Sequence, residues 1–215
     1  MTPPPGRPPG AVADMALRLP RILGAPPVPE PWAGARVEVV PMRRRHVRAV
    51  AAIEEQIFPR PWSPALYHSE LAQGPTRCYL VALAAGAVVA YTGAVIVAGE
   101  GHITTVGVAP SWHRHGVATR LLLELARESV RRGAGSLTLE VRMSNAGAQR
   151  LYHEFGFVPA GVRKNYYAEV NEDGLVMWAY DVDTPAYAGR LAAIEARLAR
   201  FEDVRAGGRR RREDA

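Results

Sequence analysis

The segment from residue 102 to residue 156 constrains the fold of this chain most, because strand and helix patterns alternate in it at short spacing. HITTVGVAP (102–110) alternates like a strand and ends at a proline. The amphipathic helix pattern that follows is stopped by Gly133 and Gly135. SLTLEV (136–141) then reads as a second strand and precedes a further helix. Strand, helix, strand and helix in this order predict a mixed α/β or α+β domain.

The same domain is expected to extend on both sides of this segment, over residues 36–183. Upstream, a strand and a helix lead to a proline-broken loop, where Ser63 is a plausible N-cap and Pro64 a first-turn proline of the next helix. Two strands joined around Ala85-Gly86 follow. Downstream, VRKNYYAEV and GLVMWAYDV predict a strand pair around the turn at residues 171–174.

Both ends of the chain differ in composition from this domain. Residues 1–35 are dense in proline and glycine, and we expect them to be disordered because they cannot bury enough apolar surface. Residues 205–215 form an arginine-rich tail that we also expect to be disordered. Residues 184–204 predict a C-terminal helix whose apolar stripe could pack on the domain, on a partner or on a second copy. The stripe consists of Leu191, Ile194, Leu198 and Phe201.

The net charge of +6 is concentrated at the C-terminus. Arg205 and Arg209 to Arg212 outnumber Glu213 and Asp214 there, and the excess supplies half of the total. Such a tail can bind RNA or a ribosomal surface through phosphate neutralisation, although a solvated end is the more common role of a charge run.

The remaining composition favours a cytoplasmic protein. The one cysteine, Cys78, excludes an intramolecular disulfide and is expected in the core. No apolar stretch approaches the roughly 20 residues of a membrane-spanning helix. Prolines also occupy the place where a signal peptide would have its apolar region.

The junction between strand 102–110 and the next helix has the features of a phosphate-binding loop. Gly116 lets the backbone approach a ligand, and small Ala118 keeps the first helical turn uncrowded, so that free amides can face an anion. The spacing is neither that of a P-loop nor that of a dinucleotide-binding fingerprint. His113 and His115 have no acidic or cysteine cluster near them, so we expect no metal there.

Together, the loop HRHGVA (113–118) and the later LEVRMSNAGAQRLYHEFGF resemble the GNAT superfamily of acetyl-coenzyme A-dependent N-acetyltransferases. The loop matches the superfamily pattern Gln/Arg-x-x-Gly-x-Gly/Ala at Gly116 and Ala118 and departs from it at His113. The resemblance covers residues 36–183. It implies an α+β (mixed α/β) fold, with a mostly antiparallel twisted sheet of six to seven strands, helices on both faces, and a splayed strand pair that holds acetyl-coenzyme A.

Within the superfamily the chain looks most similar to the RimI type, which acetylates the N-terminal alanine of a small-subunit ribosomal protein. This likeness implies a protein N-terminus as the acceptor and a ribosomal protein as the partner. Two alternatives stay open: a GNAT enzyme that acetylates a small amine or lysine side chains, and a non-catalytic module that binds the ribosome or RNA. The stretches that carry the likeness are FPRPWS, VGVAPSWHRHGVATRLL, LEVRMSNAGAQRLYHEFGF and VRKNYY.

Glu140 is a carboxylate inside a strand pattern, and such a group is costly to bury without a partner or a task. It is either a strand-end charge that reaches water or a group that moves a proton. Many GNAT enzymes place the base on the strand before the phosphate loop. That strand has no carboxylate from residue 102 onward here, and the RimI resemblance assigns the base to Glu140. We expect desolvation to raise its pKa toward the working range.

The resemblance implies further roles. Tyr152 would protonate the departing thiolate, the alternative being a tyrosine packed at the helix–sheet seam. Asn145 is a natural helix N-cap and would also hydrogen-bond the coenzyme. Trp62, Tyr166 and Tyr167 would bind the peptide, or else pack under a loop. The other expected coenzyme-binding residues are Val106, Gly107 and Val108 for the pantetheine arm, and Arg114, His115, Gly116, Val117, Ala118 and Thr119 for the pyrophosphate.

Overall fold

The structure, a computed structural model, describes residues 27–31 and 36–213, with side chains described as far as residue 204. Its centre is a seven-stranded sheet of order β1-β2-β3-β4-β5-β7-β6, in which every neighbouring pair is antiparallel except β4 and β5. The mixed, mostly antiparallel sheet that the sequence predicted is therefore confirmed. The strands are β1 (Val37–Pro41), β2 (Arg77–Ala84), β3 (Ala87–Val97), β4 (Glu100–Val108), β5 (Ser136–Arg142), β6 (Val158–Tyr167) and β7 (Glu172–Tyr180).

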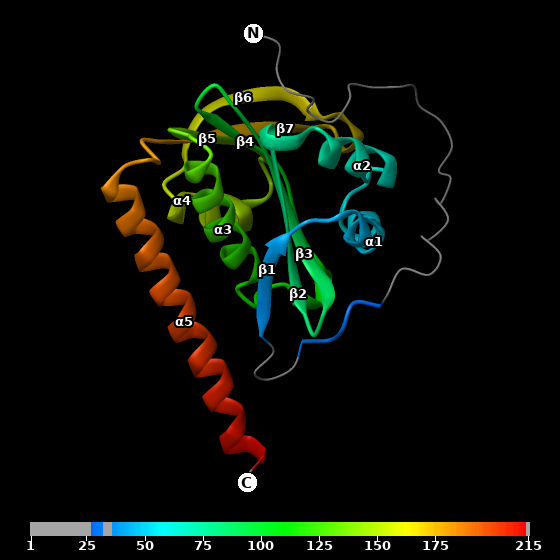
Figure 1. Ribbon diagram of the computed structural model, residues 1–215, viewed down its shortest axis with the longest axis vertical. Helices are drawn as coiled ribbons and strands as arrows, with labels where there is room; N and C mark the ends of the chain where they lie inside the picture. The colour runs from blue at the N-terminus through cyan, green and yellow to red at the C-terminus, as the bar shows by residue number, and fades with distance from the viewer. Residues whose placement is uncertain (1–26, 32–35, 214–215) are drawn as a thin grey trace.

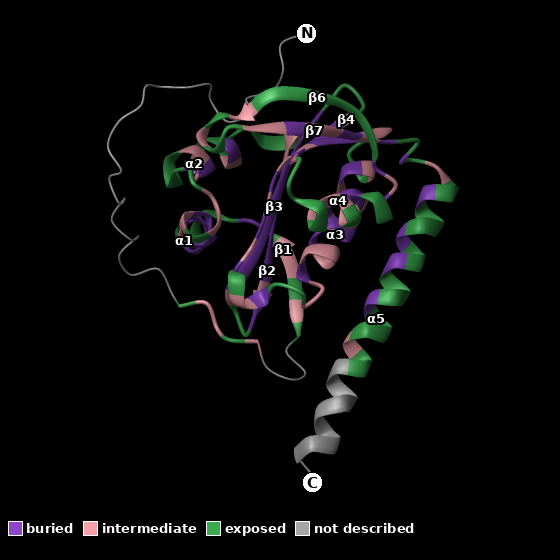
Figure 2. Ribbon diagram, turned by 180° about the vertical axis from the view of Figure 1, so that it is seen from behind, coloured by how far each residue is buried: buried purple, intermediate pink, exposed green. Residues whose placement is uncertain are grey.

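Helices cover both faces of the sheet, as expected (Figure 1). One face carries α1 (Val47–Ile57) and α2 (Pro64–Ala72), and the other carries α3 (Val117–Arg131), α4 (Ala146–Glu154) and α5 (Pro185–Glu213). The buried residues concentrate in the central strands and on the inner sides of these helices (Figure 2). None of the helices in the described part of the chain is long and apolar enough to cross a bilayer.

Several local predictions are confirmed. The Ser63 side chain accepts a hydrogen bond from the Leu66 amide and caps α2, with Pro64 in its first turn. Cys78 is buried in the core of β2, where burial raises the pKa of its thiol to about 11. The thiol therefore stays protonated near neutral pH and serves as a small core side chain.

β4 and β5 are parallel neighbours that pair only over their first four residues. The register joins Glu100–Ile103 to Ser136–Leu139 and stops there, although both strands continue. On its other side β4 remains paired with β3, and the register shifts at Thr104, which is left without a partner between Ile103 and Thr105. A bulge of this kind bends its strand. The splayed strand pair that was expected therefore forms at Thr104, where β4 leaves β5.

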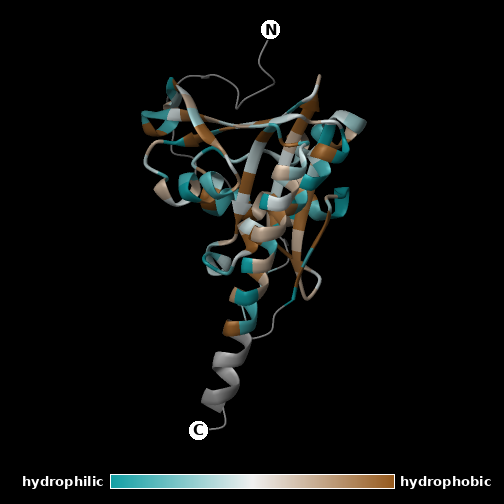
Figure 3. Cartoon of the chain, turned by 90° about the vertical axis from the view of Figure 1, so that its left-hand side faces the viewer, coloured by the Kyte–Doolittle hydropathy of each residue, from teal (hydrophilic) through white to brown (hydrophobic). Residues whose placement is uncertain are grey.

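α5 packs on its own domain, which settles one of the alternatives that the sequence left open. Its buried side chains recur at helical spacing along one stripe, and the side facing away from the sheet is exposed (Figure 2). Hydrophobic and hydrophilic positions alternate along this helix (Figure 3). Arg127 of α3 forms a two-point ion pair with Glu195 at 3.0 and 2.6 Å. The buried stripe consists of Tyr187, Leu191, Ile194 and Leu198, while Phe201, which was expected in it, is largely exposed.

Two expected boundaries at the chain ends need correction. α5 is helical to Glu213 instead of ending at residue 204. Arginine and alanine favour helix in this stretch and no proline interrupts it, while Gly207 and Gly208 are its weak helix formers. At the other end, the segment 27–31 is packed on the domain. The buried indole of Trp112 donates a 2.6 Å hydrogen bond to the carbonyl of Pro29, which gives this N–H the partner it needs. The rest of the expected disordered ends, residues 1–26, 32–35 and 214–215, lies outside the described residues.

Candidate active site

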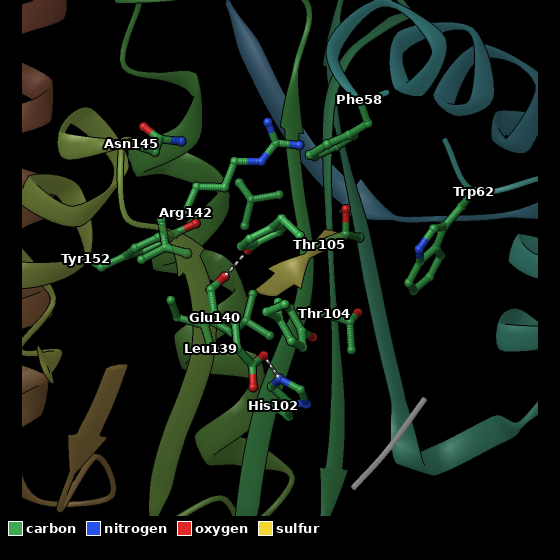
Figure 4. A pocket seen from close by; sticks show the side chains of 15 residues that line it. Phe58, Trp62, His102, Thr104, Thr105, Leu139, Glu140, Arg142, Asn145 and Tyr152 are labelled. Carbon is green, nitrogen blue, oxygen red and sulfur yellow. Dashed lines mark hydrogen bonds and ion pairs between the residues drawn. The ribbon is translucent and has the colours of Figure 1, made fainter. Parts of the chain in front are cut away.

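A cavity of about 130 Å³ lies where β4 and β5 diverge (Figure 4). Its walls come from the loop between α1 and α2, the two diverging strands, the start and body of α4, and the end of β6. The expected catalytic and peptide-binding residues all line it, together with two of the expected coenzyme-binding residues. These residues are Glu140, Tyr152, Trp62, Tyr166, Tyr167, Val106 and Asn145.

Glu140 and Tyr152 reach this cavity from opposite faces of the sheet. Along β5, Leu137 faces α3, since a side chain on its neighbour Gly101 would collide with Leu137 and come close to Ser129 of α3. Because side chains alternate along a strand, Glu140 faces the α1 side. Tyr152 belongs to α4, which lies with α3 on the other face. The opening between the strands therefore places one carboxyl group and one phenol in the lining of the same cavity.

The Glu140 side chain is only 6% exposed and is held by groups from β4 and β6. Its Oε2 lies 2.7 Å from Nε2 of His102, and its Oε1 lies 3.2 Å from the guanidinium of Arg163. The hydroxyl of Tyr167 donates to the Glu140 backbone carbonyl at 3.1 Å. The Glu140 side chain is therefore buried, and both of its carboxylate oxygens have partners. It is not a strand-end charge that reaches water.

The expected rise in the pKa of Glu140 is wrong. Burial is the largest single influence and does raise it, but the hydrogen bond and charge of His102, the charge of Arg163 and a hydrogen bond from Tyr166 together outweigh burial. The pKa of Glu140 therefore lies below its ordinary value. The sequence prediction counted desolvation alone, since it had no means of placing these three donors around the carboxylate.

Tyr152 is buried and packs against Phe157 at a ring distance of 5.9 Å. Burial raises the pKa of its phenol to about 12. The phenol is consequently protonated throughout the neutral range and can donate a proton to an atom in the cavity. The ring packs at the helix–sheet seam, as one of the two readings expected, and the residue also lines the cavity. Its role as the proton donor stays a prediction.

The aromatic residues expected to bind peptide gather on the α1 side and at the end of β6. Tyr166 and Tyr167 form an edge-to-face pair with ring centres 5.1 Å apart. Trp62 is buried and tilted against Tyr67 at 5.4 Å. Trp62 therefore packs under its loop and also lines the cavity, and its contact with a peptide stays a prediction.

Glu54 of α1 holds Trp62 and Tyr67 through hydrogen bonds on the α1 side of the cavity. The sequence analysis did not name it as a site residue. It is completely buried, and it accepts hydrogen bonds from the Tyr67 hydroxyl at 2.6 Å and from the Trp62 amide at 3.2 Å. The Thr105 hydroxyl of β4 is 3.4 Å from the same carboxylate. The signal was present in the sequence: Glu54 occupies a position on the apolar face of a helix, where a carboxylate needs a partner.

The sequence reading also missed several residues that line the cavity, among them His102, Arg142 and Phe58. His102 comes from the strand that was noted only for lacking a carboxylate. Arg142, two residues after Glu140, lies over the Tyr167 ring at 5.1 Å from its centre. Phe58 opens the loop before Trp62. Their positions along the sequence carry no signal of a shared site, because the strand divergence is what brings them together.

The expected coenzyme-binding residues lie in three places: the cavity lining, the end of β4 and the loop before α3. Val106 and Asn145 line the cavity, and Asn145 also caps α4 by accepting a hydrogen bond from the Ala148 amide at 3.0 Å, as predicted. Gly107 and Val108 continue β4 beyond the cavity lining. Gly107 has a packing reason to be glycine: a Cβ there would lie 2.3 Å from the Tyr91 ring.

The expected phosphate loop forms a left-handed turn at the start of α3. Gly116 is the N-cap, with φ of 76°, and no side chain caps this end of the helix. Arg114 also adopts a positive φ, of 63°. The first-turn amides, those of Val117, Ala118 and Thr119, are therefore left without a side-chain cap. The loop is thus built as a backbone cradle, and the Leu198 side chain of α5 packs against its Gly116.

The two histidines of this loop bond to the backbone. His113 Nε2 donates to the Val108 carbonyl at 3.0 Å, and His115 Nδ1 to the His113 carbonyl at 2.7 Å. Among the residues whose placement is described, no group of three or more His, Cys, Asp or Glu side chains could hold a metal ion. The two rings brace the turn that carries Gly116.

Comparison with known proteins places these features in a family. The model of the acetyltransferase (GNAT) family matches residues 47–157. The [ribosomal protein bS18]-alanine N-acetyltransferase of Escherichia coli K12 is 34% identical over 127 residues, which cover 58% of this chain and 84% of that protein. The N-alpha-acetyltransferase RimI of Mycobacterium tuberculosis is 34% identical over 147 residues, covering 66% of this chain and 90% of its own length.

Solved structures agree with this placement. The crystal structure of the ribosomal-protein-S18-alanine N-acetyltransferase from E. coli superposes with a TM-score of 0.63 at 30% identity, covering 68% of this chain and 94% of that one. Ard1 from Thermoplasma volcanium, at 23% identity and a TM-score of 0.62, shares the fold. α5 and the N-terminal segment lie outside the family match. The chain belongs to the GNAT family of acetyltransferases and, within it, to the RimI type.

Proposed function

We propose that this protein transfers the acetyl group of acetyl-coenzyme A to the N-terminal amine of a protein, with the N-terminal alanine of a small-subunit ribosomal protein as its substrate. The observation that carries the proposal is the cavity at the opening between β4 and β5, which is lined by Glu140 of β5 and by Tyr152 of α4. The relatives named for this reaction support the substrate class.

GNAT acetyltransferases use acetyl-coenzyme A, and the residues of this chain fit it as a co-substrate. Beyond Ile103, the side of β4 that faces β5 pairs with no strand in the described part of the chain, so Val106, Gly107 and Val108 can offer backbone groups to an extended pantetheine arm. The uncapped first turn of α3, from Gly116 to Thr119, suits a pyrophosphate. Arg114 and His115 complete that loop, and Asn145 stands at the cavity end of α4.

The chemistry requires an amine to lose a proton and a thiolate to gain one. An N-terminal amine has a pKa of about 8, whereas the pKa of Glu140 is depressed. Glu140 therefore acts as a weak base that orients the amine and accepts its proton only as the nitrogen begins to form its new bond. Tyr152, on the opposite face, holds a proton with a pKa of about 12 and gives it to the departing sulfur.

The peptide enters from the α1 side of the sheet. Trp62 lines the cavity from the loop between α1 and α2, and Tyr166 and Tyr167 line it from the end of β6. All three present aromatic faces with polar tips, which suit a chain end. Arg142 lines the same cavity and carries a positive charge.

The proposal is tested by mass spectrometry with acetyl-coenzyme A and two peptides. One peptide begins Ala-Arg, and the other has a blocked N-terminus and an internal lysine. We expect acetylation of the free alanine amine only, with loss of activity in Glu140→Gln. Reaction of the lysine peptide alone, or of a small amine alone, would overturn the substrate class. If the coenzyme binds but no amine reacts, the chain is a binding module.

A further inference from the structure

His102 is a second titratable group in the cavity, and the mechanism above does not use it. It belongs to the last part of β4 that still pairs with β5, opposite Thr138, so the sheet holds its backbone on both sides. Its side chain is 9% exposed. Its ring nitrogen Nε2 lies 2.7 Å from Oε2 of Glu140, and the two side chains point toward each other (Figure 4).

The other charged and titratable groups around this pair are few. From β6, Arg163 contacts the second carboxylate oxygen of Glu140 at 3.2 Å, and it is 44% exposed. Tyr166 and Tyr167 come from the same strand, Arg142 from β5 and Tyr152 from α4. The α1–α2 side contributes the uncharged Phe58 and Trp62 to the lining. Of all these groups, the imidazole is of the type that changes its charge between pH 5 and 8.

The contact between Nε2 of His102 and Glu140 fixes which proton of the imidazole can be gained or lost. In both charge states the Nε2–H of His102 can donate to Glu140, so the proton that is gained or lost resides on Nδ1. A protonated ring adds a positive charge 2.7 Å from the carboxylate and makes Glu140 a weaker base. A neutral ring keeps the hydrogen bond and removes the charge. The carboxylate is then held in the same place but accepts a proton more readily.

We propose that His102 is a positioning residue that orients Glu140 and sets its strength as a base according to pH. The inference rests on the proposed function, in which Glu140 accepts a proton from the substrate amine. In one turnover the amine proton passes to Glu140 and then to water, and His102 keeps its Nε2–H. The proposal predicts that the acidic limb of the pH profile of kcat changes when a side chain that cannot change its charge replaces His102.

The test compares wild type with His102→Gln, whose amide N–H can still donate to Glu140 but does not titrate. His153→Gln is the matched control, because His153 is an exposed histidine of α4 outside the cavity. The measurement is kcat with both substrates saturating, across about pH 5 to 9, so that free substrate amine does not enter the profile.

We expect wild type and His153→Gln to lose activity by up to about tenfold per pH unit on the acidic side, as one titrating group requires. His102→Gln should stay within about tenfold of wild type near pH 8 and have an acidic limb displaced by at least about one pH unit, or none. An unchanged limb overturns the proposal. A folded His102→Gln protein that is inactive at every pH also overturns it, since His102 would then do more than adjust Glu140.

A second readout needs no substrate and separates this inference from the proposed function. The NMR signal of the His102 ring is followed across pH in wild type and in Glu140→Gln. Because the carboxylate favours the charged ring, the midpoint should fall in the variant. Equal midpoints show that the pair is not coupled and overturn the inference, whatever the enzyme acetylates. A shifted midpoint in a protein that acetylates no N-terminus refutes the proposed function alone.

Discussion

We expect Glu54 to hold Trp62, and with it the α1 side of the cavity, in place. Its carboxylate is completely buried and receives the Tyr67 hydroxyl at 2.6 Å and the Trp62 amide at 3.2 Å, with Thr105 at 3.4 Å. A hydrogen bond to a charged group contributes about 1.5–3 kcal/mol to stability. Tyr67→Phe removes one such donor and should lower the free energy of unfolding by that amount.

Glu54→Ala removes the acceptor and leaves three buried donors, those of Tyr67, Trp62 and Thr105, without this partner. The loss should be larger, about 3–5 kcal/mol, because each orphaned group also keeps its desolvation cost. The double variant Glu54→Ala with Tyr67→Phe should lose less than the sum of the single losses, since both remove the same bond. Gln56→Ala on the exposed side of α1 is the control and should change stability by less than about 0.5 kcal/mol.

Urea unfolding at neutral pH measures these differences, and peptide kinetics show their functional effect. We expect KM for the alanine peptide to rise in Glu54→Ala, because Trp62 loses its anchor, while coenzyme binding is unchanged at a temperature where the variant is folded. Additive losses in the double variant, or a Glu54→Ala protein within about 1 kcal/mol of wild type, would refute the role assigned to this carboxylate.

Further expected outcomes concern single positions. Tyr152→Phe should lower kcat by about a hundredfold or more without moving the urea midpoint, because only a proton donor is lost; equal kcat would remove Tyr152 from the mechanism. Leu198→Ala should destabilise the fold by about 2–5 kcal/mol, as seen in thermal unfolding, if α5 is part of the domain core. Gly107→Ala should cost about 1–3 kcal/mol through its collision with the Tyr91 ring, and a neutral result would contradict the packing of that ring. The pKa of Glu140 is lower in the folded state than its ordinary value of 4.5, so its contacts stabilise the fold above that pH and this contribution is lost as the pH falls through the folded value. The urea midpoints of wild type and Glu140→Gln should therefore converge in acid, and a constant difference from pH 7 to pH 3 would show that the carboxylate's charge is not responsible.

The sequence by itself determined the features that act over one or two helical turns or along one strand. The cap at Ser63, the cap at Asn145 and the turn at Gly116 each depend on residues a few positions apart, and all three form as predicted. The order of strands and helices followed from periodicity for the same reason. Glu140 and Tyr152 were identified through the family pattern that these local features support.

Only the tertiary structure decided how the site is assembled and charged. His102 and Glu140 are 38 residues apart and meet because two parallel strands pair up to Ile103 and then diverge at the Thr104 bulge. His102 and Arg163 of β6 lower the pKa of Glu140, whereas the sequence analysis expected burial to raise it. The docking of α5 on the domain through Leu198 could not be predicted from the sequence either. An apolar stripe shows that a helix needs a partner, but which surface covers it depends on where the rest of the chain has folded.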